Sequence, residues 1–192
     1  MNSDFSTIIL AGGKGQRMGG HDKGLVQYHG QPLIHHSVEL ANQCAGRIII
    51  SANRNIMQYE VLADLVVQDG SPDYGGPLFG LQACASRVLT DYTLVIACDL
   101  PRLTTHLVRG LQKALLDQAP QPDAVVYRQA GFLQCGLIAI KTPALASIDS
   151  ELEQGQRSVK RWLQSLSLFV LDSDDAQAFA NFNTPSDLQA AP

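Results

Sequence analysis

Cysteine is scarce in this chain and poorly placed for metal binding. The four cysteines, Cys44, Cys84, Cys98 and Cys135, lie far apart, with no CxxC pair and no histidine pair at ligand spacing. A structural zinc site needs such closely spaced ligands. The sequence therefore argues against a structural zinc domain, and we expect buried free thiols of the kind kept in a reducing cytoplasm.

Long apolar runs and an excess of positive charge are also missing. The first apolar run, TIIL, is short and follows Asp4 rather than a basic residue, so we expect neither a signal peptide nor a membrane span. The formal net charge is −4, whereas a nucleic-acid-binding domain normally carries a broad basic face. We therefore expect a cytoplasmic protein that binds neither nucleic acid nor membranes.

What the sequence does contain is the material of one ordinary globular domain. Its 192 residues are 45% hydrophobic and 17% charged, which is near the average for soluble domains and enough to bury a core. No internal repeat, low-complexity tract or long linker divides it. We expect a single domain over residues 1–192, and a monomer.

Short apolar runs rich in isoleucine, valine and leucine alternate with segments of helical periodicity. Strands of a parallel sheet, buried on both faces, read as such continuous runs. We expect strands at 6–11, 47–53, 64–69, 92–99, 123–128, 137–141 and 168–172, and helices at 32–44, 78–89, 104–118 and after Thr184. The alternation predicts a Rossmann-like three-layer α/β fold, with a mainly parallel sheet and helices on both faces.

A loop rich in glycine and positive charge, LAGGKGQRMGGHDKGL at 10–25, follows the first expected strand. It is not a GxxxxGK[ST] P-loop, because His21 stands where the lysine should be, and Met18 breaks the GxGxxG dinucleotide pattern. Its glycines let backbone N–H groups approach an anion, while Arg17 and Lys23 add charge. The loop is predicted to hold a polyphosphate; the alternative is a solvated surface turn.

Several segments carry a resemblance to a known enzyme family. LAGGKGQRM followed by Lys23 is similar to the LxGGxGxRM…K signature of nucleotidyltransferases that act on sugar phosphates and related compounds. Further matches are MGGHDKGL (18–25), SANR (51–54), Asp69, GGPLFGL (75–81), CDLP (98–101) and NFNTPSDL (181–188). Together they resemble molybdenum cofactor guanylyltransferases, Mg²⁺-dependent enzymes that transfer GMP from GTP to the terminal phosphate of molybdenum-bearing molybdopterin and release pyrophosphate.

The resemblance implies roles for the matched residues of a nucleotide-binding half, about 1–100. Lys23 and Asp99 are implied to be catalytic, with Asp99 also the Mg²⁺ ligand, and Arg17 is our candidate for steadying the leaving pyrophosphate. Asp69 has a second interpretation as a helix-capping carboxylate. The implied nucleotide-binding residues are Leu10, Ala11, Gly12, Gly13, Lys23, Ser51, Asn53, Asp69 and Asp99.

The acceptor-binding half, about 101–192, carries fewer matches. Arg157, Lys160 and Arg161 in GQRSVKRWL are candidates to hold a phosphate of molybdopterin, and Arg157 lies in a stretch that resembles the family's. Their alternative is a solvated helix face around a buried Trp162. Asn181 and Asn183 match the family's closing motif, and they either line the acceptor site or cap the last helix.

Two positions depart from the family pattern and keep alternatives open. Ser51 stands where several relatives have asparagine, and Gln134 with Cys135 stands where some have His-Pro. Because a serine cannot make the bidentate contact of an amide, a cytidylyltransferase for the same pterin and a small sugar-phosphate nucleotidyltransferase remain alternatives. A GTP-binding scaffold without turnover is a third. Otherwise we expect GTP and molybdopterin as substrates, and transient contacts with cofactor-delivery proteins and apo-molybdoenzymes.

Overall fold

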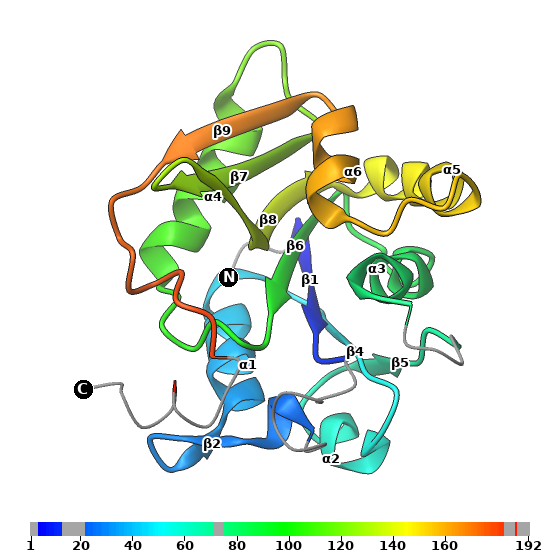
Figure 1. Ribbon diagram of the computed structural model, residues 1–192, viewed down its shortest axis with the longest axis vertical. Helices are drawn as coiled ribbons and strands as arrows, with labels where there is room; N and C mark the ends of the chain where they lie inside the picture. Colours follow the sequence, from blue (N-terminus) through cyan, green and yellow to red (C-terminus); the bar gives the residue numbers. More distant parts are fainter. Residues whose placement is uncertain (1–3, 13–21, 71–74, 183–186, 188–192) are drawn as a thin grey trace.

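The computed structural model describes residues 4–12, 22–70, 75–182 and 187, and a seven-stranded sheet forms its centre (Figure 1). The strand order is β5-β4-β1-β6-β8-β7-β9, and β8 alone in this sheet runs antiparallel to its neighbours. A two-stranded hairpin lies beside it. The sheet strands are β1 Phe5–Leu10, β4 Ile48–Ser51, β5 Leu65–Val67, β6 Tyr92–Ala97, β7 Ala124–Gln129, β8 Phe132–Lys141 and β9 Leu168–Asp172; the hairpin is β2 Gln27–Tyr28 with β3 Gln31–Pro32.

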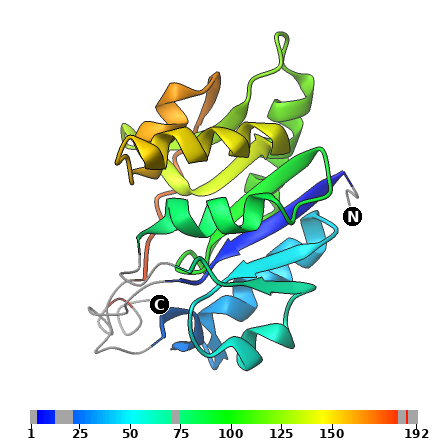
Figure 2. The same cartoon turned by 90° about the vertical axis from the view of Figure 1, so that its right-hand side faces the viewer.

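Helices cover both faces of this sheet, so the expected three layers are confirmed. The helices are α1 Leu33–Cys44, α2 Ile56–Glu60, α3 Pro77–Ala85, α4 Thr105–Asp117, α5 Ser147–Glu153 and α6 Val159–Ser165, with 3₁₀ turns η2 Lys23–Leu25 and η3 Thr142–Ala146. One apolar cluster joins α1 and α4 to the sheet, and a second joins α3, α5 and α6 to the opposite face. Figure 2 shows α3 and α5 running across that second face.

Strand β1 shows why the apolar runs become central strands. Ile8 and Ile9 are both fully buried, yet they belong to the two different clusters because successive side chains of a strand point to opposite faces. A continuous apolar run is therefore what a strand between two helical layers requires. All seven strands expected in the sheet are present.

The structure differs from expectation at several boundaries. Helix α3 ends at Ala85, four residues before the expected end. Strand β8 begins at Phe132, well before the expected residue 137, because a tight turn at Ala130 and Gly131, with φ of 48° and 82°, folds it back on β7. The closing helix expected after Thr184 falls almost wholly beyond the part of the chain that the structure describes.

The parallel strands β4, β1 and β6 end side by side, and their carboxyl ends form the edge where ligands bind in such sheets. Just past the strand ends, the Ala11 amide donates to the Ser51 carbonyl (3.0 Å) and the Cys98 amide donates to the Leu10 carbonyl (3.1 Å). Because β8 is antiparallel, its first residues reach this same edge. The topology thus gathers residues 10–12, the end of β6 and the start of β8.

No helix among the described residues is long and apolar enough to cross a membrane.

Candidate active site

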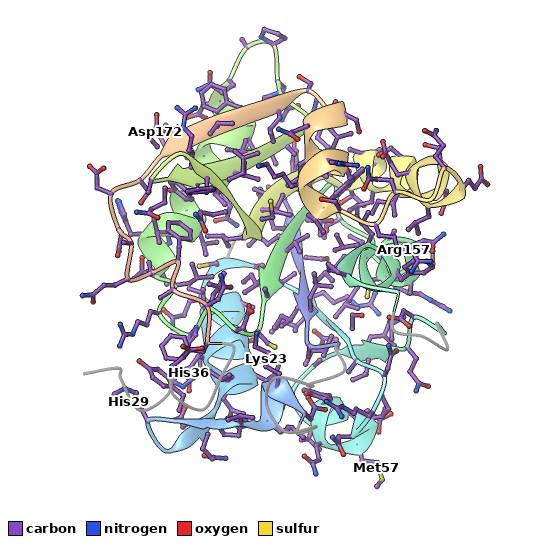
Figure 3. All side chains as sticks on the ribbon, viewed as in Figure 1. Lys23, His29, His36, Met57, Arg157 and Asp172 are labelled. Carbon is purple, nitrogen blue, oxygen red and sulfur yellow. The ribbon has the colours of Figure 1, made fainter. Side chains whose placement is uncertain are left out.

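A cavity of about 420 Å³ opens at this edge of the sheet, and its lining comes from both halves of the chain. Most of the site residues implied by the sequence meet in it: Leu10, Ala11, Gly12, Lys23, Asp99, Arg157 and Asn181. Gly13, Arg17 and Asn183, also implied, lie outside the described residues. Lys23 belongs to η2, and Figure 3 shows Arg157 well apart from it, over α3, so the two cations approach from different elements.

Lys23 and Asp99 form an ion pair within the cavity. The Lys23 Nζ lies 2.6 Å from Asp99 Oδ2, and the side chains are 21% and 17% exposed. The second carboxylate oxygen, Asp99 Oδ1, is buried and has no hydrogen-bond partner among the described residues. A buried oxygen in that condition is rare in folded proteins, because its desolvation is uncompensated. Asp99 therefore presents one oxygen bound to a cation and one available for a ligand.

Asp22, a buried carboxylate next to this lysine, was not predicted from the sequence to have a role in the site. Asp22 is 9% exposed; its Oδ1 accepts from the Tyr59 hydroxyl (2.7 Å) and the Gly24 amide (3.2 Å), and its Oδ2 accepts from Asn55 Nδ2 (2.9 Å). The network fixes the turn that carries Lys23 against helix α2. The single sequence signal was the position of Asp22 inside the matched segment MGGHDKGL, because its partners on α2 are distant in the chain.

The packing around Tyr59 shows how closely this network is fitted. Tyr59 is fully buried, and burial together with its hydrogen bond to Asp22 raises the pKa of the phenol, which therefore stays a donor. A Cβ added to Gly24 would lie 2.5 Å from the Tyr59 hydroxyl oxygen, so a side chain at this position would displace the ring. Arg54 adds an ion pair to Asp22 at 3.7 Å.

Three further residues with an implied nucleotide role lie near the same edge but are not part of the cavity lining. Ser51 is 2% exposed, and a Cβ on Gly80 would lie 2.6 Å from its hydroxyl oxygen, so this hydroxyl faces α3. Asn53 Oδ1 accepts from the Asp69 amide (3.0 Å). The helix-capping interpretation of Asp69 is wrong for α3, because the N-cap of that helix is Gly76.

Another part of the cavity lining comes from the start of α6 and from the last described segment. Arg157 precedes Ser158, the N-cap of α6. Arg157 therefore lies just before the helix rather than on its face, but its side chain is exposed, as the solvated alternative predicts. Trp162 is fully buried, as expected. Asn181 lines the cavity, and the amide of the next residue, Phe182, donates to the Asp99 carbonyl at 3.0 Å. That bond holds Asn181 beside Asp99.

Phe182 is itself clamped by two side chains. Its ring, 3% exposed, packs on Tyr28 with centroids 4.7 Å apart, and the Arg102 guanidinium lies 5.5 Å from its centroid. Arg102 Nε also donates to the Tyr28 hydroxyl at 2.9 Å. The position of Asn181 is thus determined by aromatic packing that no local sequence pattern indicates.

The cavity cysteines are not arranged for nucleophilic catalysis. All four cysteines are free thiols, as expected, although Cys135 is only partly buried. Burial raises the pKa of both Cys98 and Cys135, which line the cavity, so both remain protonated near neutral pH. The described residues hold no cluster of three metal-ligating side chains, so a metal bound among them would draw further ligands from substrate or water.

Comparisons with known proteins identify the family of this chain. Residues 7–169 match the MobA-like NTP transferase domain. The chain is 36% identical over 192 residues to the molybdenum cofactor guanylyltransferase of Bordetella petrii, covering 99% of this chain and 98% of that one. It is 36% identical to that of Shewanella frigidimarina over 190 residues, covering 98% and 96%.

Solved structures show the same fold at lower identity. Molybdopterin-guanine dinucleotide biosynthesis protein A from Archaeoglobus fulgidus has a TM-score of 0.75 at 20% identity, covering 96% of this chain and 95% of that one. A CMP-2-keto-3-deoxy-manno-octonic acid synthetase complexed with CTP has a TM-score of 0.74 at 14% identity, covering 98% and 96%. With the fold, the cavity and the full-length relatives in agreement, the chain belongs to the MobA-like NTP transferase family, among the molybdenum cofactor guanylyltransferases.

Proposed function

We propose that this enzyme transfers GMP from GTP to molybdopterin carrying molybdenum, forming the guanine dinucleotide cofactor and releasing pyrophosphate. The observation that carries the proposal is one cavity that brings Lys23 and Asp99 from the nucleotide-binding half against Arg157 and Asn181 from the acceptor-binding half. The names of the full-length relatives support the same substrates.

The reaction needs alignment and charge neutralisation rather than an activated side chain. An oxygen of the acceptor phosphate attacks the α-phosphorus of GTP, and a new P–O bond forms. The bond from that phosphorus to the bridging oxygen breaks, and its electron pair leaves with pyrophosphate. Because the attacking phosphate is already anionic, no side chain has to act as a nucleophile. The protonated thiols of Cys98 and Cys135 agree with this.

The part of the cavity lining formed by residues 10–12, Lys23 and Asp99, here called the nucleotide wall, is proposed to bind the phosphates of GTP. Gly12 and its neighbours offer backbone groups, and Lys23 offers a positive charge beside the site of transfer. Arg17, outside the described residues, is proposed to stabilise the pyrophosphate. Base and ribose contacts are proposed at the strand ends that carry Asn53 and Asp69, with Ser51 closing that side.

Mg²⁺ fits the chemistry of Asp99. The buried Oδ1 of Asp99 has no hydrogen-bond partner among the residues that the structure describes, and a hard carboxylate oxygen is a preferred magnesium ligand. Magnesium is often held by one or two carboxylates together with substrate phosphates and water, so a single aspartate suffices. When bound there, Mg²⁺ would neutralise negative charge on the phosphates as the transfer proceeds.

The part of the cavity lining formed by Arg157, Ser158 and Asn181, here called the acceptor wall, is proposed to bind molybdopterin through its terminal phosphate. Arg157 supplies the positive charge, and the Asn181 amide supplies a donor and an acceptor next to Asp99. Asn183, beyond the described ranges, is proposed to extend this wall.

The four free thiols suit a reducing cytoplasm, where we also propose contacts with cofactor-delivery proteins and apo-molybdoenzymes.

The test is direct transfer by the purified protein. α-Labelled GTP, Mg²⁺ and molybdenum-bearing molybdopterin are expected to give labelled dinucleotide and one pyrophosphate for each GMP transferred. Ser51 departs from the family pattern, and its hydroxyl is buried against α3. Parallel reactions with CTP, UTP and ATP therefore test the alternative bases directly. Intact GTP beside a competent acceptor would contradict the proposal, and preferred use of CTP would reassign the base.

A further inference from the structure

The two cations of the cavity have different partners. Lys23 is paired with Asp99 at 2.6 Å. The Arg157 guanidinium lies within ion-pair distance of no carboxylate among the described residues; instead it lies over the ring of Phe79, 5.8 Å from the centroid. Figure 3 shows Arg157 over helix α3, the helix that carries this ring.

The backbone that carries Arg157 is fixed independently of its side chain. Gln156 Oε1 accepts from the amides of Arg157 (3.0 Å) and Ser158 (2.9 Å). Ser158 in turn caps α6, where its hydroxyl accepts from the Arg161 amide at 3.4 Å. The remaining freedom of Arg157 therefore lies in its own long side chain, whose guanidinium contacts Phe79.

Phe79 is held firmly enough to direct that guanidinium. It lies in the first turn of α3, where its amide donates to the Gly76 carbonyl at 3.2 Å, and the adjacent Leu78 anchors the helix as a fully buried residue. The ring rests against the backbone of Gly75, where an added Cβ would lie 2.3 Å from it. Helix α3 thus presents a fixed aromatic surface to Arg157.

An aromatic ring suits this task better than a carboxylate would. The ring attracts the guanidinium through its electron-rich face and accepts none of the N–H donors in the guanidinium plane. A carboxylate would occupy two of those donors and cancel the charge. With Phe79 as support, Arg157 keeps both its charge and its donors for a dianionic phosphate monoester.

We propose that Phe79 is a positioning residue that presents Arg157 to the terminal phosphate of the acceptor. This inference rests on the proposed function, since it takes that phosphate to be the ligand of Arg157. It gives Phe79 an effect on acceptor affinity that acts through Arg157 and leaves GTP binding untouched.

A double-mutant cycle of Phe79→Leu and Arg157→Gln tests the proposal in the transfer assay. Phe79→Leu is expected to raise the KM for molybdopterin about two- to fivefold, the range of one cation–π contact to an exposed guanidinium, with the KM for GTP unchanged. In the Arg157→Gln background the same change is expected to have no further effect. Phe79→Tyr, which keeps the aromatic face, is expected to restore the affinity.

Two controls separate positioning from folding. Phe169→Leu removes a half-buried ring from β9, away from the cavity, and should leave both KM values unchanged. Phe79→Met keeps the apolar volume without an aromatic face, so it replaces Phe79→Leu if that variant does not fold. An equal rise of the acceptor KM in the Arg157→Gln background would overturn the proposal.

Failure of the proposed function has a separate signature. If the wild-type protein transfers no GMP, calorimetric titration with molybdopterin alone still compares it with Phe79→Leu. Weaker binding by about twofold or more supports the positioning role, and equal binding overturns it.

Discussion

The nucleotide wall and the acceptor wall of the cavity handle positive charge in opposite ways. On the nucleotide wall, Lys23 is neutralised by Asp99 and the turn that carries it is fixed by the buried carboxylate of Asp22. On the acceptor wall, Arg157 rests on an aromatic ring and keeps its charge. A nucleotide that brings Mg²⁺ to Asp99 would free Lys23 for its phosphates, whereas Arg157 attracts an anion directly.

The sheet shows the same division. The nucleotide wall lies at the ends of β1 and β6, two parallel strands that are neighbours in the sheet. The acceptor wall depends on the antiparallel strand β8, the short helix α6 and the segment that ends at Phe182. The molecule joins a regular nucleotide-binding half to a less regular acceptor half.

Removing the carboxylate of Asp99 is expected to have the largest effect on this arrangement. Asp99→Ala should lower the rate of GMP transfer about a thousandfold, because it removes the carboxylate that we propose as the protein ligand of Mg²⁺ at the transferred phosphate. Nucleotide binding should be partly retained, because Lys23 is released to contact the phosphates. Pyrophosphate release measures the rate, and Asp117→Ala on the exposed face of α4 is the control. Transfer at the wild-type rate would favour a non-catalytic GTP-binding scaffold.

Breaking the network behind Lys23 should damage the nucleotide wall and leave the acceptor wall intact. Asp22→Ala leaves the buried Tyr59 hydroxyl and the buried Gly24 amide without their acceptor, so we expect a loss of about 3 kcal/mol in unfolding free energy. Urea unfolding measures it. Asp172→Ala, which breaks an exposed pair with Arg128, should have little measurable effect. Equal stability of Asp22→Ala and wild type would show that the network is dispensable.

Thiol reactivity offers a smaller effect that distinguishes the two walls. Burial raises the pKa of Cys135 on the acceptor wall and of Cys98 on the nucleotide wall, so at pH 8 little thiolate exists at either. Cys135 is partly exposed and should react first with a chromogenic disulfide reagent, with Cys98 at least about tenfold slower. Loss of the faster phase in Cys135→Ser confirms the order; its persistence would contradict it.

The parallel part of the fold could be predicted because its determinants are local. Each buried strand is a continuous apolar run, and each loop after it begins with recognisable residues. The antiparallel start of β8 could not be predicted, because the turn before it uses Ala130 at a φ of 48°, where glycine or asparagine usually provides the signal.

The site likewise contains residues that a sequence pattern predicted and one whose role depends on tertiary contacts. Lys23, Asp99, Arg157 and Asn181 were predicted by resemblance to a family pattern and meet in the cavity. The supporting role of Asp22 could not be predicted, because its hydrogen bonds reach residues 33 and 37 positions away. Such networks depend on tertiary packing, which a single sequence does not specify by spacing.

The most direct test of two walls with separate tasks is the pair of KM values in two variants of the transfer enzyme. Lys23→Gln is expected to raise the KM for GTP about tenfold or more, with little change for molybdopterin. Arg157→Gln is expected to do the reverse, because its charge faces the acceptor phosphate. If both variants raised the same KM to the same extent, the cavity would not be divided between the two substrates as described.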